Sequence, residues 1–77
     1  MEISKAIEIV LDATYSKALE HTPFTSNHEA YGVLLEEVAE YFDCIREKKP
    51  DKAHCVEELA DIAAVCMKAL MQLCTDS

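Results

Sequence analysis

The sequence predicts an all-α protein: a three-helix subunit in which the second and third helices form an antiparallel hairpin. Apolar residues recur at spacings of three and four in three separate segments, as they do in amphipathic helices. Only one glycine and two prolines occur among 77 residues, which is too few for the many turns of a small sheet protein. Apolar residues make up 51% of the chain, so we expect one folded domain over residues 1–77.

The first helix is expected over residues 3–20. Its apolar positions include Ile3, Ile7, Val10 and Leu11. The segment should end shortly after residue 20, because Pro23 disfavours helical backbone in the residue that precedes it.

The second helix is expected over residues 27–48. Ser26 and Glu29 have the spacing of a capping box, with Asn27 as the alternative cap. The basic residues before Pro50 suit the negative end of the helix dipole, and the proline ends the helix. The following residues form its predicted apolar stripe: Tyr31, Leu34, Leu35, Val38, Phe42 and Ile45.

The third helix is expected from residue 51 or 52 to residue 73, with Asp51 as a candidate cap. It is apolar nearly all round between residues 62 and 74, where only Lys68 and Gln72 are strongly polar. Such a helix is buried on more than one side. Two other helices of one short chain cannot cover it, so we expect a homodimer or tetramer that completes the helical bundle.

The net charge of −8 argues against nucleic-acid binding, which needs a basic surface. No apolar run reaches the roughly 20 residues that span a membrane. The N-terminal residues lead directly into an amphipathic pattern without a secretion signal, which predicts a cytoplasmic protein. We therefore expect the four cysteines to be free and mostly buried thiols.

Two pairs of acids stand out on the predicted hairpin. Glu37 and Glu40 lie three residues apart on the second helix, and Glu58 and Asp61 have the same spacing on the third. At about 100° per residue, each pair lies on one helix face, one turn apart. Both pairs lie on the same rotational side of their apolar stripes, so four carboxylates could line one cleft.

Clustered carboxylates repel one another unless cations occupy the space between them. Hard oxygen ligands favour Mg²⁺, Mn²⁺ or Ca²⁺ over Zn²⁺. The alternative is that the acids are ordinary solvated charges, since glutamate favours helices and is common on exposed faces.

The pattern Glu36-Glu37-x-x-Glu40 followed by Glu58-x-x-Asp61 resembles the EExxE…ExxD signature of the MazG-like nucleotide pyrophosphohydrolases. The segment before it, from His28 to Leu35, is similar to small phage and bacterial members of that family. The match covers about residues 23–73. The chain is shorter than many members, and a further helix that often helps to cover the nucleotide is absent.

The resemblance implies a helical subunit that forms dimers or dimers of dimers. It also implies Mg²⁺-dependent cleavage of nucleoside triphosphates to monophosphate and pyrophosphate, with Mn²⁺ as the alternative metal. Matched by position, Glu37, Glu40, Glu58 and Asp61 would be the metal ligands. Glu36 would orient or deprotonate the attacking water, although it points about 100° away from Glu37 and could equally be a solvated charge.

Further residues are candidates for substrate binding. Lys48, Lys49 and Lys52, near the hairpin turn, could contact phosphates, or they could complement the helix dipole. Tyr41 could stack on a base and His28 could touch the substrate, with capping or packing as the alternative for the histidine.

Core packing is the expectation for Phe42.

The alternative to an enzyme is a non-catalytic, oligomeric helical module that binds a partner, a nucleotide or a metal.

Overall fold

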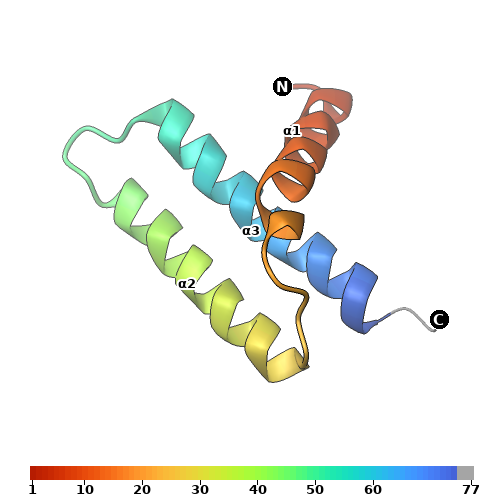
Figure 1. Cartoon of the computed structure of the whole chain (residues 1–77). Helices are drawn as coiled ribbons and strands as arrows, with labels where there is room; N and C mark the ends of the chain where they lie inside the picture. Colours follow the sequence, from red (N-terminus) through yellow and green to blue (C-terminus); the bar gives the residue numbers. More distant parts are fainter. Residues whose placement is uncertain (75–77) are drawn as a thin grey trace.

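The structure, a computed structural model, describes residues 1–74, and this part of the chain is all-helical, as predicted. Helix α1 spans Ile3–Ser16 and is followed by a short 3₁₀ helix, η1, at Ala18–Glu20. Helix α2 spans Asn27–Ile45, and α3 spans Lys52–Leu73. The helices α2 and α3 run antiparallel side by side, while α1 lies across α3 (Figure 1).

Helix α1 ends at Ser16, four residues before the predicted end. The hydroxyls of Thr14 and Ser16 donate to the carbonyl oxygens of Val10 and Asp12, at 2.7 Å and 2.6 Å. Such bonds back to the preceding turn tend to bend and weaken a helix. Lys17 then leaves the helical conformation, and η1 continues the chain in a new direction.

The predicted starts of α2 and α3 are confirmed. The Ser26 hydroxyl accepts a hydrogen bond from the Glu29 amide at 3.1 Å, and Asp51 accepts one from the Ala53 amide at 3.0 Å. The carboxylate of Glu29 accepts from the Thr25 amide, one residue earlier than an ordinary capping box requires. Both caps satisfy amides that the helix itself leaves without partners.

Helix α2 ends at Ile45 rather than at Lys48. Pro50 disfavours helical backbone at Lys49. The residues between Ile45 and Lys52 therefore form the turn that reverses the chain into α3.

Helix α3 is the central element of the fold. It packs against α1, η1 and α2, whereas in the described chain α1 and α2 share no Cα pair within 8 Å. The buried centre of its contact with α1 and η1 is made of small side chains, which allow the backbones to approach closely, and Ile9 packs against it. The small side chains are those of Ala13 and Ala18 on one side and Ala60 and Ala64 on the other.

A second apolar cluster joins the start of α2 to the second half of α3. Phe24, Ala30 and Val65 form its buried centre. At the other end of the hairpin, the thiol of Cys44 near the end of α2 lies 3.6 Å from the ring of His54 near the start of α3. These contacts at both ends confirm the predicted antiparallel hairpin.

The apolar stripe predicted for the second helix mostly points away from the protein. Phe42 is 49% exposed, so the expectation that it packs in the core is wrong. The side of α2 that faces α3 carries Ala30 and Cys44, together with Leu34 from the predicted stripe. Helix α2 thus has two apolar rows, and the row with the smaller side chains packs inside.

Helix α3 has a comparable exposed row. At about 100° per residue, the rows of the antiparallel helices turn to the same face of the hairpin, opposite the face that α1 covers. We call this surface the outward stripe. Its members on α2 are Tyr31, Leu35, Val38, Phe42 and Ile45, and on α3 they are Val56, Leu59, Ala63, Cys66 and Leu70; all are exposed except Ala63, which is half-buried.

All four cysteines are free. Cys44 is buried and Cys55 half-buried, but Cys66 and Cys74 are exposed, so only two of the four thiols fit the expectation of burial. Within residues 1–74, no helix combines the length and the apolar character that crossing a bilayer requires.

Candidate functional site

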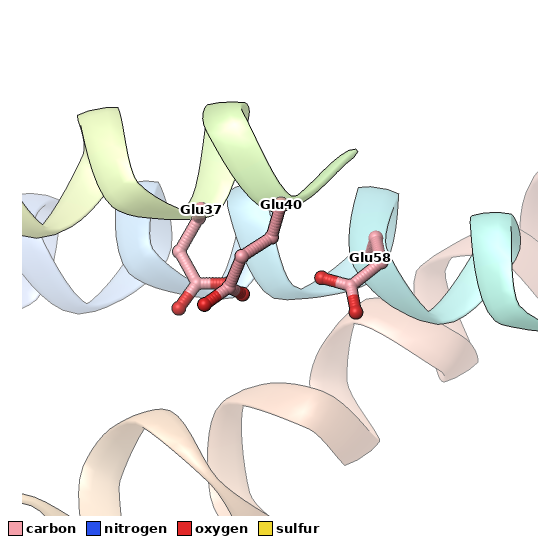
Figure 2. A group of neighbouring side chains, drawn as sticks. All are labelled: Glu37, Glu40 and Glu58. Atoms are coloured by element: carbon pink, nitrogen blue, oxygen red, sulfur yellow. The ribbon is translucent and has the colours of Figure 1, made fainter. Parts of the chain in front are cut away.

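Three acidic side chains converge where α2 and α3 pack together. Glu37 and Glu40 lie one turn apart on α2, and Glu58 lies opposite them on α3 (Figure 2). One carboxylate oxygen from each residue can be chosen so that all three lie within 4.8 Å of one another. The structure thus brings together three of the four residues that the sequence predicted as metal ligands.

Asp61, the fourth predicted ligand, lies one turn after Glu58 and is engaged in an ion pair. Its Oδ1 atom is 3.5 Å from the ammonium of Lys17, which also donates to Glu57 at 2.7 Å. The charge of Asp61 nevertheless contributes to raising the pKa of Glu37, so it acts on the same cluster. Asp61 therefore lies beside the three converging carboxylates, with Lys17 as a competing partner.

The cluster is electrostatically unfavourable without a cation. Burial raises the pKa of Glu37 from 4.5 to about 7, with further contributions from Glu40, Asp61 and Glu58. Among the described side chains, three buried carboxylate oxygens make no hydrogen bond: Glu37 Oε2, Glu58 Oε2 and Asp61 Oδ1. Asp61 Oδ1 still has the ammonium of Lys17 at 3.5 Å, but the oxygens of Glu37 and Glu58 have no such partner. Buried oxygens without partners cost free energy, and a bound cation would satisfy them.

The donor set fits a hard divalent cation. Every converging ligand atom is a carboxylate oxygen, which suits Mg²⁺, Mn²⁺ or Ca²⁺. Glu37, Glu40 and Glu58 could hold one such ion, and Asp61 could join them if it exchanged Lys17 for the metal.

His54 contacts Glu58 of the cluster, and the sequence pattern of acids gave no sign of this contact. Its Nε2 lies 2.9 Å from Glu58 Oε1, so the ring orients that carboxylate. Its Nδ1 faces the thiol of Cys44, whose pKa is raised to about 12, mainly through a hydrogen bond with Cys55 and through burial. The spacing of four residues between His54 and Glu58 on one helix was the available signal.

A cavity of about 750 Å³ lies beside the acids. The connection between α1 and α2 forms one side of it, and α2 and α3 form the other. Glu36, Glu37 and Asp61 line its wall, so the candidate base Glu36 faces the same space as two of the predicted ligands. A molecule in this cavity would contact the acidic cluster through Glu37, since Glu40 and Glu58 are not among the lining residues.

The predicted substrate-binding residues lie elsewhere, and none of them lines this cavity. His28 is exposed in the first turn of α2, nine residues before Glu37 and thus about 13 Å away along the helix axis. Tyr41 is half-buried, one residue after Glu40. The three predicted lysines are exposed at the hairpin turn or at the first residue of α3: Lys48, Lys49 and Lys52.

Two other lysines line the cavity instead. Lys17 holds Glu57 and Asp61, and Lys68 is 3% exposed on α3. Lys68 was visible in the sequence as the one charge in an apolar run, but its surroundings depend on how the segment before α2 folds over α3.

No protein-family model, curated protein sequence or solved structure matches this chain. The resemblance to MazG-like proteins therefore depends on the acidic motif and the residues that precede it.

Proposed function

We propose that this protein is a Mg²⁺-dependent nucleoside triphosphate pyrophosphohydrolase, which converts NTP or dNTP and water to the monophosphate and pyrophosphate. The observation that carries the proposal is the convergence of Glu37, Glu40 and Glu58, with buried oxygens that lack protein partners. The MazG-like spacing of these acids supplies the reaction class. A cavity large enough for a small ligand opens beside them.

Each acid has a role in this proposal. Glu37, Glu40 and Glu58 hold the cation, and Asp61 assists them. When bound, Mg²⁺ supplies neutralisation of phosphate charge and activation of water. Glu36 accepts a proton from the water as the water oxygen attacks the α-phosphorus. The bond from that phosphorus to the bridging oxygen breaks, and pyrophosphate leaves.

The proposal includes a homo-oligomer, with the outward stripe as the contact between subunits. On α2 the stripe residues follow at spacings of four and three, and on α3 at spacings of three and four. This is the repeat by which helices pack as coiled coils. Two hairpins that meet through this face would form a four-helix bundle and cover side chains such as Phe42 and Leu70, each about half exposed.

The proposal places the reaction in the cytoplasm. Nucleoside triphosphates are made and used there, and the four free thiols are stable in that reducing compartment.

The test is the release of pyrophosphate from a panel of ribo- and deoxyribonucleoside triphosphates with Mg²⁺. The wild type should release pyrophosphate from at least one nucleotide, and Glu37→Gln should release none. Glu47→Gln, at an exposed position in the hairpin turn, is the matched control and should remain active. If the folded wild type releases none from any nucleotide, the alternative of a non-catalytic helical module replaces the enzyme.

A further inference from the structure

Lys68 is a buried cation in the wall of the cavity. Its side chain is on α3, and the residue is 3% exposed. The ammonium donates to the carbonyl oxygen of Thr22 at 2.9 Å and lies 4.3 Å from the centre of the Phe24 ring. In the described part of the chain, Lys68 forms no ion pair.

This ammonium has donor capacity that the protein leaves unused. A lysine ammonium carries three N–H groups, of which one is given to Thr22 and one side faces the Phe24 ring. A buried charge with few partners is unfavourable, so its retention indicates an acceptor from outside the chain. The cavity that Lys68 lines is the space from which such an acceptor would reach it.

The position of Lys68 relative to the acids matches the length of a nucleotide. Lys68 follows Asp61 by seven residues, which is two turns of the same helix and about 10 Å along its axis. Both residues line the same cavity. Phosphates held at the acids would leave the sugar to cross this interval, with the base beside Lys68.

The surroundings of Lys68 suit a base better than a phosphate. Val33, Ala64 and Val65 line the cavity with apolar surface, which suits the faces of a flat ring. The carboxylates of Glu20 and Glu29 also line it and would repel a phosphate. The ammonium of Lys17 is already paired with two carboxylates, so of the described lysines that line the cavity only Lys68 has no acidic partner.

We propose that this cavity is the nucleobase subsite and that Lys68 donates a hydrogen bond to a carbonyl oxygen of the base. This inference rests on the proposed function, because the acids must hold the phosphates. Uracil, thymine, cytosine and guanine each carry such an oxygen. Adenine has no carbonyl oxygen: its amino group, in place of the guanine carbonyl, would meet one donor with another, and its only acceptors are ring nitrogens. The site should therefore prefer the four carbonyl-bearing bases to adenine.

The test is calorimetric binding of nucleoside monophosphates in Mg²⁺, which requires no turnover. The wild type should bind at least one carbonyl-bearing monophosphate about tenfold or more tightly than AMP, because a buried donor left unpaired is costly. Lys68→Met, which keeps the length of the side chain without its charge, should lose that preference and leave AMP binding nearly unchanged. Lys5→Met, at a lysine that is exposed on α1 and does not line the cavity, is the control and should keep the preference.

A second variant keeps the proposal testable if Lys68→Met does not fold. Val33→Phe should fill the cavity, weaken the binding of every nucleoside monophosphate and leave the affinity for Mg²⁺ unchanged. Equal wild-type affinity for AMP and the carbonyl-bearing nucleotides would overturn the proposal, as would an equal loss for all of them in Lys68→Met. Selective binding without pyrophosphate release would refute the hydrolase and keep the base subsite. Pyrophosphate release without a base preference that depends on Lys68 would keep the hydrolase and refute the subsite.

Discussion

The two long faces of the α2–α3 hairpin differ in the kind of side chain that they present. On the face that α1 and η1 partly cover, the carboxylates of Glu37, Glu58 and Asp61 interrupt the apolar packing. On the opposite face, the outward stripe runs along both helices without a charged side chain. One face is therefore unfavourable without a cation, and the other is unfavourable without a covering surface.

This difference separates two requirements within one short chain. A bound cation would relieve the charge repulsion on the first face, and association with a second copy would relieve the apolar exposure on the second. Because the two faces share the same helices, a ligand bound on one face or a subunit bound on the other should stabilise both helices. Changes that act on one face only can show whether the requirements are independent.

The largest effect is expected from a charge in the middle of the outward stripe. Phe42→Asp should raise the dissociation constant of the oligomer more than about 100-fold, because an unpaired buried carboxylate costs about 3 kcal/mol or more. Sedimentation over a range of protein concentrations would measure it. Ile3→Asp makes a similar change at an exposed position on α1, outside the stripe, and should leave association unaltered. A wild type that is monomeric at every concentration would refute the assigned interface.

A smaller effect is expected when one carboxylate of the inner face is neutralised. Glu37→Gln should raise the metal-free free energy of unfolding by about 1–2 kcal/mol, since it removes repulsion and keeps the shape of the side chain. The same variant should lose the increase in Tm that Mg²⁺ causes in the wild type. Chemical denaturation with and without Mg²⁺ measures both effects. Glu47→Gln should change neither, and a destabilised Glu37→Gln would show that the carboxylate is already satisfied within the protein.

The pH dependence of stability should report the same carboxylate. The pKa of Glu37 is about 7 in the folded protein against 4.5 in the unfolded chain, so between these values the folded state retains a proton that the unfolded chain has released. This contribution is complete below pH 4.5 and is lost as the pH rises through about 7. After allowance for solvent screening, it should be on the order of 1 kcal/mol. Denaturation curves at several pH values should show this fall in the wild type, without metal, and not in Glu37→Gln.

The smallest effect is expected at the exposed edge of the inner face. Glu57 accepts a hydrogen bond from Lys17, and this contact lowers the pKa of Glu57. Exposed ion pairs contribute little, so Glu57→Gln should leave the free energy of unfolding nearly unchanged. Its affinity for Mg²⁺, measured by calorimetry, should match the wild type. A large loss of metal affinity would show that Glu57 belongs to the cluster.

The parts of the fold that depend on local chemistry were predictable from the sequence. Ser26 and Asp51 cap their helices because a cap needs only its own side chain and the next few amides. The ends of α1 and α2 were placed too late. Their positions depend on how the chain turns to bring the next helix onto α3, which periodicity does not record.

The inward face of α2 was not predictable from apolar spacing alone. The row with Tyr31 and Phe42 is larger and more apolar than the row with Ala30 and Cys44, yet the smaller row packs against α3. The larger row is the one that hydrophobicity favours for burial, and the single chain leaves it exposed. A sequence pattern identifies surfaces that favour burial but does not say whether the same chain covers them.

The candidate site likewise has a part that the sequence predicted and a part that it did not. The pairing of acids one turn apart follows from helix geometry, and the structure brings Glu37, Glu40 and Glu58 together as expected. Lys68 contacts Thr22 and Phe24, which are 46 and 44 positions earlier in the chain and lie in a segment without regular structure. No periodic signal links residues so far apart, so the lysine was visible in the sequence but its partners were not.

The central position of α3 has a consequence for local unfolding. Since α1 contacts α3 and η1 but not α2, it can detach without opening the hairpin. The amides of α1 should then exchange with solvent deuterium faster than those in the middle of α3, whose release requires the whole fold to open. While α1 is detached, the convergence of Glu37, Glu40 and Glu58 would persist, because all three belong to the hairpin. The wall of the cavity formed by Lys17 and the residues after it would be displaced. A cation bound at the three acids would then stay in place, while a larger ligand in the cavity would dissociate.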